Sequence, residues 1–163
     1  MVLTACTAER APSSETAQLN SNEVKEETPG HEQTQFTTTI YSLDLINFKG
    51  AKINELPFYS NGEIKHLTED TVKSFSEGHH PWLRHVETFI ASQVTNLVPD
   101  DYKKGGGIKS EFIKIKNLSD DAAIATITLG SSFFYEITIE ASENTGNLFF
   151  ITNIVLHSTI DKK

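Results

Sequence analysis

Residues 108–158 read IKSEFIKIKNLSDDAAIATITLGSSFFYEITIEASENTGNLFFITNIVLHS, and this stretch decides the fold. It contains four runs of β-favouring residues, separated by short turns rich in Asn, Asp, Ser and Gly. The runs cover residues 108–116, 122–129, 133–141 and 148–158. Connections this short join antiparallel neighbours, so the stretch predicts a four-stranded antiparallel meander.

A long helix is predicted upstream of the meander. Pro81 suits its first turn, where the missing N–H costs no hydrogen bond, and Pro99 ends it. Apolar residues recur between them at steps of three and four, which predicts an amphipathic helix of about 17 residues. These apolar positions are Leu83, Val86, Ile90, Val94 and Leu97. The glycine run 105–107 follows as a flexible turn, because a phosphate-binding loop would need a strand before it and a helix after it.

Shorter elements are predicted before this helix. Thr68 is an N-cap candidate for a short helix that Gly78 interrupts, and Asn61-Gly62 is a strong two-residue hairpin turn. Alternation of apolar and polar residues from Phe36 onward predicts a further strand. We therefore expect one α+β domain over residues 36–160, preceded by a tether over residues 1–35.

Composition limits the partners. The 163 residues carry a formal net charge of −8 with a pI near 5.2, whereas binding nucleic acid requires clustered Lys and Arg. No apolar run is long enough to span a membrane. Residues 7–35 are rich in Ser, Thr, Glu, Gln and Asn and poor in large apolar residues, which is typical of a disordered acidic tether.

The start of the chain, Leu3-Thr4-Ala5-Cys6, resembles the lipobox of bacterial lipoproteins, and Cys6 is the only cysteine. The resemblance implies cleavage before Cys6, a diacylglyceryl group on its thiol and an extracytoplasmic, membrane-anchored protein. Only Met1 and Val2 precede the motif, so the basic and apolar parts of a signal peptide are expected upstream of Met1. The alternative is a chance match on the flexible tail of a cytosolic protein, where Cys6 is a free thiol.

The order of a long helix followed by a four-stranded meander resembles the cystatin-like and NTF2-like α+β folds. The resemblance covers residues 68–158 and rests on element order. It implies a curved sheet, of four strands or more, wrapped around the helix. Because such domains serve many unrelated roles, the resemblance does not assign a function.

Candidate chemistry is sparse. His66, His79, His80 and His85 are the densest group of possible metal ligands, but residues 80 and 85 lie about 140° apart on a helix, so we expect no metal site. Paired acids at 100–101 and 120–121 flank turns, where Asp bonds to local backbone. No cofactor motif is present in the sequence. We expect no enzyme.

The faces of the last two strands supply the candidate sites. Residues on both faces of the final strand are apolar, so we expect both faces to be covered, either by the segment 36–59 of the same chain or by a partner or second copy. The candidate interface residues are Phe134, Phe149, Ile151 and Val155. If a pocket exists between helix and sheet, we expect Trp82, Tyr135 and Thr152 to line it.

The sequence thus predicts a non-catalytic binding or assembly domain of a cell-surface lipoprotein. Its partner could be a protein, an envelope glycan or another copy of the chain. The alternative is an NTF2-like domain that binds a small ligand, or acts on one, in a cavity between helix and sheet.

Overall fold

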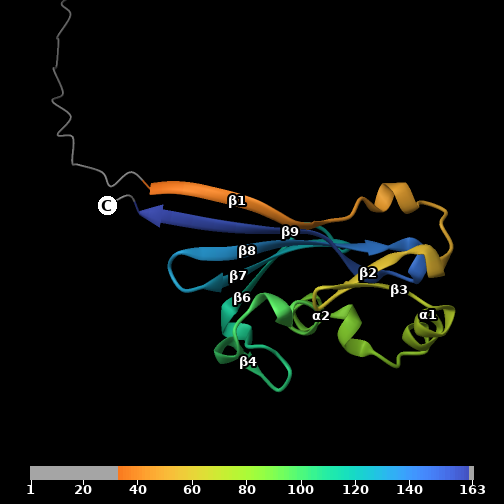
Figure 1. Ribbon diagram of the computed structural model, residues 1–163. Coiled ribbons are helices and arrows are strands. Elements are labelled where there is room, and N and C mark those ends of the chain that lie inside the picture. Colours follow the sequence, from red (N-terminus) through yellow and green to blue (C-terminus); the bar gives the residue numbers. More distant parts are fainter. Residues whose placement is uncertain (1–32, 162–163) are drawn as a thin grey trace, which may run out of the picture. The chain divides into compact units, whose positions relative to one another are not determined.

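A five-stranded antiparallel sheet dominates the computed structural model, which describes residues 33–161 (Figure 1). The strand order is β1-β9-β8-β7-β6. The strands are β1 (Gln33–Ser42), β6 (Ile113–Asn117), β7 (Ala122–Leu129), β8 (Phe133–Ser142) and β9 (Leu148–Asp161). The α+β class and the meander β6–β9 are therefore confirmed, and β1 adds a fifth strand beside β9. Cys6 and most of the predicted tether lie outside the described residues.

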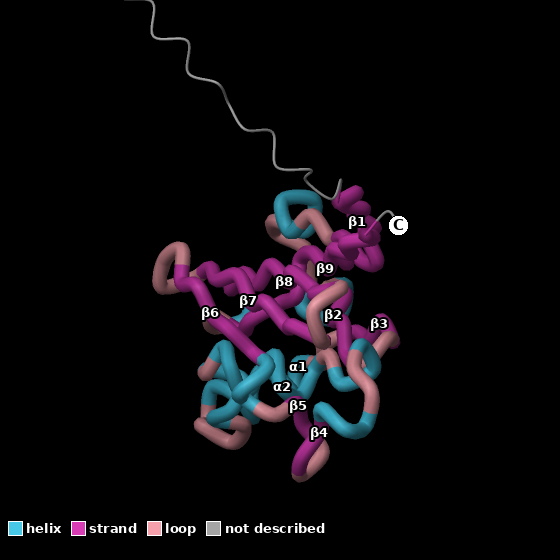
Figure 2. Tube along the Cα trace, turned by 90° about the vertical axis from the view of Figure 1, so that its left-hand side faces the viewer, coloured by secondary structure: helices cyan, strands magenta, loops and turns pink. Residues whose placement is uncertain are grey.

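Both α-helices pack on one face of this sheet (Figures 1 and 2). Two α-helices are present in the described part, α1 (Glu69–Ser76) and α2 (Val86–Gln93). The 3-10 turns are η1 (Leu45–Phe48), η2 (Ile53–Glu55), η3 (Pro81–Arg84), η4 (Thr95–Leu97), η5 (Asp100–Tyr102), η6 (Ser110–Phe112) and η7 (Glu143–Thr145). Two small hairpins pair β2 (Pro57–Ser60) with β3 (Glu63–His66), and β4 (Lys103–Lys104) with β5 (Gly107–Ile108). As predicted, Thr68 caps α1, where its Oγ1 accepts from the Thr71 N–H at 3.1 Å.

The predicted 17-residue helix is wrong in length. It is divided into η3, α2 and η4, because His85 and Val94 leave the helical region of φ and ψ. The end of α2 has a clear physical cause in the β2–β3 turn. The backbone N–H of Asn61 donates to the Gln93 carbonyl at 2.7 Å, and Asn61 Nδ2 donates to the Ser92 carbonyl at 3.0 Å. A continuing helix would use both carbonyls for its own hydrogen bonds, so Asn61 ends it.

The same asparagine starts the next turn. Asn61 Oδ1 accepts from the Thr95 N–H at 2.9 Å and from Thr95 Oγ1 at 2.7 Å, which caps η4. Asn61 and Gly62 have φ of +51° and +87°, as expected for the predicted Asn-Gly hairpin. One predicted hairpin turn therefore sets where a helix 30 residues later ends.

The glycine run is a tight hairpin turn between β4 and β5. Gly105 and Gly106 take positive φ. At Gly107 a Cβ atom would lie 3.2 Å from the Ala91 carbonyl oxygen, so this glycine allows β5 to approach α2 closely. The first predicted meander strand, residues 108–116, is accordingly split into β5, η6 and β6.

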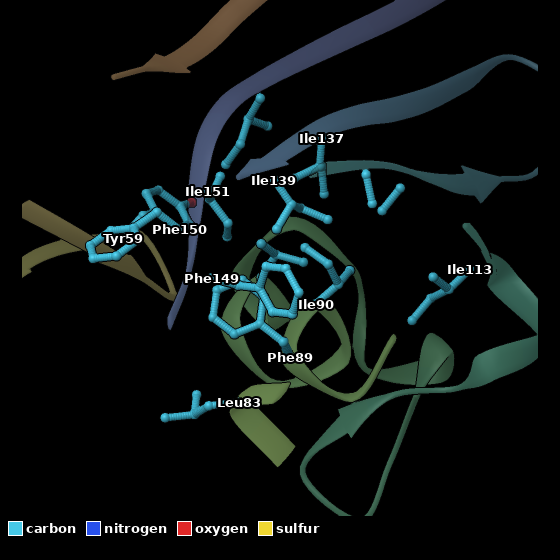
Figure 3. Close-up of a cluster of buried hydrophobic side chains, with 14 of the residues drawn as sticks. Tyr59, Leu83, Phe89, Ile90, Ile113, Ile137, Ile139, Phe149, Phe150 and Ile151 are labelled. Atoms are coloured by element: carbon cyan, nitrogen blue, oxygen red, sulfur yellow. The ribbon is translucent and has the colours of Figure 1, made fainter. Parts of the chain in front are cut away.

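The core lies between α2 and the sheet (Figure 3). Phe89 and Ile90 of α2 are fully buried against side chains of β8 and β9 that point from the same face of the sheet. Ring centroids of Phe89 and Phe149 lie 6.2 Å apart. The buried side chains on this helix-side face of β8 and β9 include Ile137, Ile139, Phe149, Ile151 and Ile154.

A β-bulge in β9 changes the predicted alternation of faces. Ile151 lies opposite Ile139, but Asn153 lies opposite Thr138, so Thr152 is an extra residue in β9. Beyond the bulge, Ile154 continues the face of Ile151. The expectation that Phe149, Ile151 and Val155 belong to one interface is therefore wrong.

The opposite face of β9 is covered at its start by the same chain. Phe150 is fully buried, and its ring lies 5.8 Å from that of Phe58 in β2. Leu45 and Phe48 of η1 also pack against the core, and η1 lies across the sheet from α1 (Figure 1). Residues 43–59 thus cover this end of the second face. β1 does not cover it, because β1 is the edge strand of the sheet.

Candidate interaction surface

The four candidate interface residues do not lie together. Phe149 and Ile151 are 8% and 1% exposed and belong to the core under α2. Phe134 and Val155 are half-buried and point away from the helices, because each lies on the other side of its strand from the buried isoleucines. The cause is the bulge at Thr152, and a bulge has no reliable signal in one sequence.

Phe134 and Val155 belong to a broad outer face of the sheet. The aromatic rings of Phe134 and His157 stack 4.5 Å apart, at an interplanar angle of 6°. Away from the end that residues 43–59 cover, no side chain on this face is fully buried. By strand register this part of the face includes Thr37, Thr39, Lys114, Lys116, Ile124, Thr126, Thr128, Phe134, Glu136, Thr138, Asn153, Val155 and His157.

The outer face ends at β1, which is an edge strand. Within the described residues β1 pairs only with β9, so its other edge is open. The side chains at positions 35–40 are all exposed, and those of Phe36 and Ile40 are 50% and 45% exposed. Residues 33–42 contain no charged side chain and no proline. The absence of charge was visible in the sequence, but nothing local indicated that β1 would be an edge.

The three candidate pocket residues are also separated. Trp82 is 42% exposed at the rim of a depression of about 290 Å³ between the β2–β3 hairpin and η3. Thr152 is buried in the bulge, where its Oγ1 donates to the Thr138 carbonyl at 3.4 Å. Tyr135 lies on the helix-side face opposite Leu156. Neither Tyr135 nor Thr152 lines the depression beside Trp82.

Tyr135 belongs instead to a tyrosine cluster. The rings of Tyr41 and Tyr59 lie 4.9 Å apart, and the Tyr59 hydroxyl bonds to the Asn96 side chain. Burial raises the pKa of Tyr41, and nearby Tyr59 adds to the shift. The pKa of Tyr135 is raised for the same two reasons. Because these pKa values are raised, Tyr41 and Tyr135 stay neutral at physiological pH, and the cluster serves packing between β1, β2 and β8.

Gln93 lines the depression at Trp82 and has one polar atom without a hydrogen-bond partner among the described residues. Ser92 Oγ donates to the Phe89 carbonyl at 2.9 Å and therefore accepts from Gln93 Nε2 at 3.2 Å. This leaves Gln93 Oε1 buried and without a partner among the described residues. Lys65, His66 and His80 also line the depression, and no acidic residue does. A small ligand with a hydrogen-bond donor would fit this chemistry.

Other clusters are less organised. In the part of the chain that the structure describes, no three His, Cys, Asp or Glu side chains converge as metal ligands. His79 lies 3.8 Å from Glu77, whereas His66 and His80 lie at the Trp82 depression. Two adjoining depressions, of about 430 and 370 Å³, flank Arg84 and Asp120, and a third of about 420 Å³ lies beside η1.

Comparison with known proteins gives no match to any family model, curated protein or solved structure. Within residues 33–161, the helices are too short or too polar to cross a lipid bilayer. The surfaces of the domain are therefore the basis for a functional proposal.

Proposed function

We propose that this chain is a cell-surface lipoprotein, anchored through Cys6, whose domain works by binding or assembly and without catalysis. In this proposal the α+β domain is a relative of the cystatin-like and NTF2-like folds. Helices packed on one face of an antiparallel sheet support that relationship in outline, although the long helix is interrupted.

The open edge of β1 carries the proposal. An exposed edge strand presents unpaired N–H and C=O groups to any chain that can add a strand, and proteins use this for peptide and protein recognition. Ten residues without charge or proline make β1 well suited to such pairing. On the outer face, Thr37 and Thr39 of β1 lie at this edge, so a bound strand could also contact side chains there.

The binding role is tested by photo-crosslinking in cells. A photoreactive residue at Thr39, beside the open edge, is expected to give a covalent adduct of higher mass in the full-length gene product. The same residue at Thr128, an exposed site on β7 away from the edge, is the matched control and is expected to give much less adduct. Equal adducts at the two sites, or none at Thr39, would contradict binding through this edge.

The anchor is tested by fractionation. Cys6→Ser in the full-length gene product is expected to remove the protein from the membrane fraction, because serine has no thiol to accept the lipid. Substitution at an unrelated position of the tether, such as Ser13→Ala, should leave the fractionation unchanged. A membrane-bound Cys6→Ser variant would overturn the lipoprotein proposal and leave the binding role of the domain open.

A second candidate function is small-ligand binding at the Trp82 depression. Gln93 Oε1 has no donor among residues 33–161, and it favours this function because a buried acceptor without a donor costs free energy that a bound hydroxyl or amide N–H would recover. The depression lies at the surface between hairpin and η3, and it is not a cavity between helix and sheet. Trp82 is the only tryptophan, so its fluorescence would report a bound ligand directly.

A further inference from the structure

The two edges of the sheet differ in how well they are protected against pairing with another strand. β6, at one edge, has five residues and carries Lys114 and Lys116, both exposed. Short length and lysines are the usual protection of an edge against unwanted pairing. β1, at the other edge, is twice as long and has neither protection. Pairing is therefore possible at one edge and discouraged at the other.

The hydrogen-bonding direction of β1 follows from two backbone bonds. The Thr159 N–H donates to the Ser132 carbonyl on the β8 side, so its β1 partner Gln35 is not bonded to it. Ile40 is an extra residue in β1, because Thr39 lies opposite Val155 and Tyr41 lies opposite Ile154. Beyond this bulge the Leu43 N–H donates to the Thr152 carbonyl of β9, and across the bulge Thr39 points away from β9. Because bonded and non-bonded pairs alternate in an antiparallel ladder, the backbone groups of Gln35, Thr37 and Thr39 point to the open edge.

The charge distribution permits an identical partner at this edge. The chain carries a net charge of −8, so two copies repel at most orientations. Neither β1 nor residues 148–160 of β9 contain Asp, Glu, Lys or Arg. Two copies that meet along β1 therefore keep their charges away from the contact. A charged partner would find nothing complementary there.

We propose that two copies of this chain pair through β1 in an antiparallel, two-fold symmetric arrangement. The proposal rests on the binding role of the β1 edge and names its partner. With Thr37 opposite Thr37 of the second copy, Gln35 of each copy faces Thr39 of the other. These three facing pairs exchange about six hydrogen bonds and join the two sheets into one. Because the contact uses the same patch twice and both outer edges are the protected β6, assembly stops at two copies.

Side chains fit this register. The Thr37 side chains meet across the two-fold axis on the outer face, and threonine pairs are favourable cross-strand neighbours. On the helix-side face Phe36, which is half-exposed in the single chain, lies against Thr38 of the second copy. Phe133 is 41% exposed and lies opposite Ser158 of β9. Ser158 in turn lies opposite Phe36 of β1, so the three side chains form one row across the sheet. The contact thus shields the ring of Phe36, which one copy leaves half-exposed.

Sedimentation equilibrium of the purified chain, from about 1 to 500 μM, tests the proposal and is expected to show a monomer–dimer equilibrium. Thr37→Pro removes the N–H group at the centre of the proposed contact. This N–H makes no hydrogen bond within the single chain, so the substitution should weaken dimerisation at least about tenfold. Thr37→Lys, which sets like charges opposite each other, should also weaken it. Thr128→Lys adds the same charge on the same face away from the edge and should leave it unchanged.

Cysteine pairs test the register. In a Cys6→Ser background, Thr37→Cys should form a disulfide-linked dimer on mild oxidation, since facing Cα atoms about 5.5 Å apart suit a disulfide. Gln35→Cys alone should not, but a mixture of Gln35→Cys and Thr39→Cys should. A chain that stays monomeric to 500 μM, or a dimer that Thr37→Pro leaves intact, overturns the inference. If the chain is monomeric but the Thr39 adduct still forms in cells, the binding role stands with a different partner.

Discussion

Phe149→Glu is expected to unfold the domain or bring it close to unfolding. The side chain is 8% exposed and packs against Phe89 of α2, so the substitution removes a buried ring and places a carboxyl group in the core. Loss of a buried Phe side chain alone costs about 3–5 kcal/mol, and the unpaired polar group adds to this. Since domains of this size are stable by about 5–15 kcal/mol, most of the stability is lost. Urea denaturation followed by far-UV circular dichroism measures the effect.

Phe134→Glu is the matched control. It introduces the same residue in a neighbouring strand, but on the outer face, where the main loss is the stacking of Phe134 on His157. We expect a cost of about 1 kcal/mol or less. Ile151→Lys should behave like Phe149→Glu, because Ile151 is equally inaccessible. If Phe149→Glu and Phe134→Glu are equally stable, the bulge at Thr152 and the assignment of faces are incorrect.

Asn61→Ala is the second substitution with a large expected effect. The Asn61 side chain makes three hydrogen bonds, one to the Ser92 carbonyl and two from Thr95, which end α2 and begin η4. At roughly 1 kcal/mol for each bond, their loss costs about 2–3 kcal/mol. The φ of +51° at this position adds about 1 kcal/mol for alanine, because only Gly, Asn and Asp adopt it readily.

Asn61→Gly separates the two contributions. Glycine keeps the backbone conformation but loses the side-chain bonds, so its midpoint in urea should fall between those of the wild type and Asn61→Ala. Asn54→Ala is the matched control. Asn54 is an exposed residue of η2, and its side chain makes no such hydrogen bonds among the described residues, so the substitution should leave the midpoint nearly unchanged. A domain that tolerates Asn61→Gly without loss would show that α2 and η4 are separated by another cause.

Local signals in the sequence determined much of this fold. The short connections at Gly130 and Gly146 set β7, β8 and β9 in antiparallel order, because their lengths permit no other pairing. Asn61-Gly62 specified its hairpin, and Thr68 specified the start of α1. Each signal acts within a few residues, through turn geometry or a single cap, and therefore survives in any tertiary context.

The tertiary structure decided the length of α2, the faces of β9 and the position of β1. Apolar spacing from Pro81 to Leu97 suits one helix, but hydrogen bonds from Asn61, more than 30 residues away, take the carbonyls that would continue it. The bulge at Thr152 arises between two paired strands and reverses the alternation that one strand shows alone. β1 alternates like a strand that could cover the sheet, yet it lies at the edge because main-chain pairing with β9 satisfies its backbone. The candidate surface therefore follows from contacts between distant segments, which periodicity and turn residues do not encode.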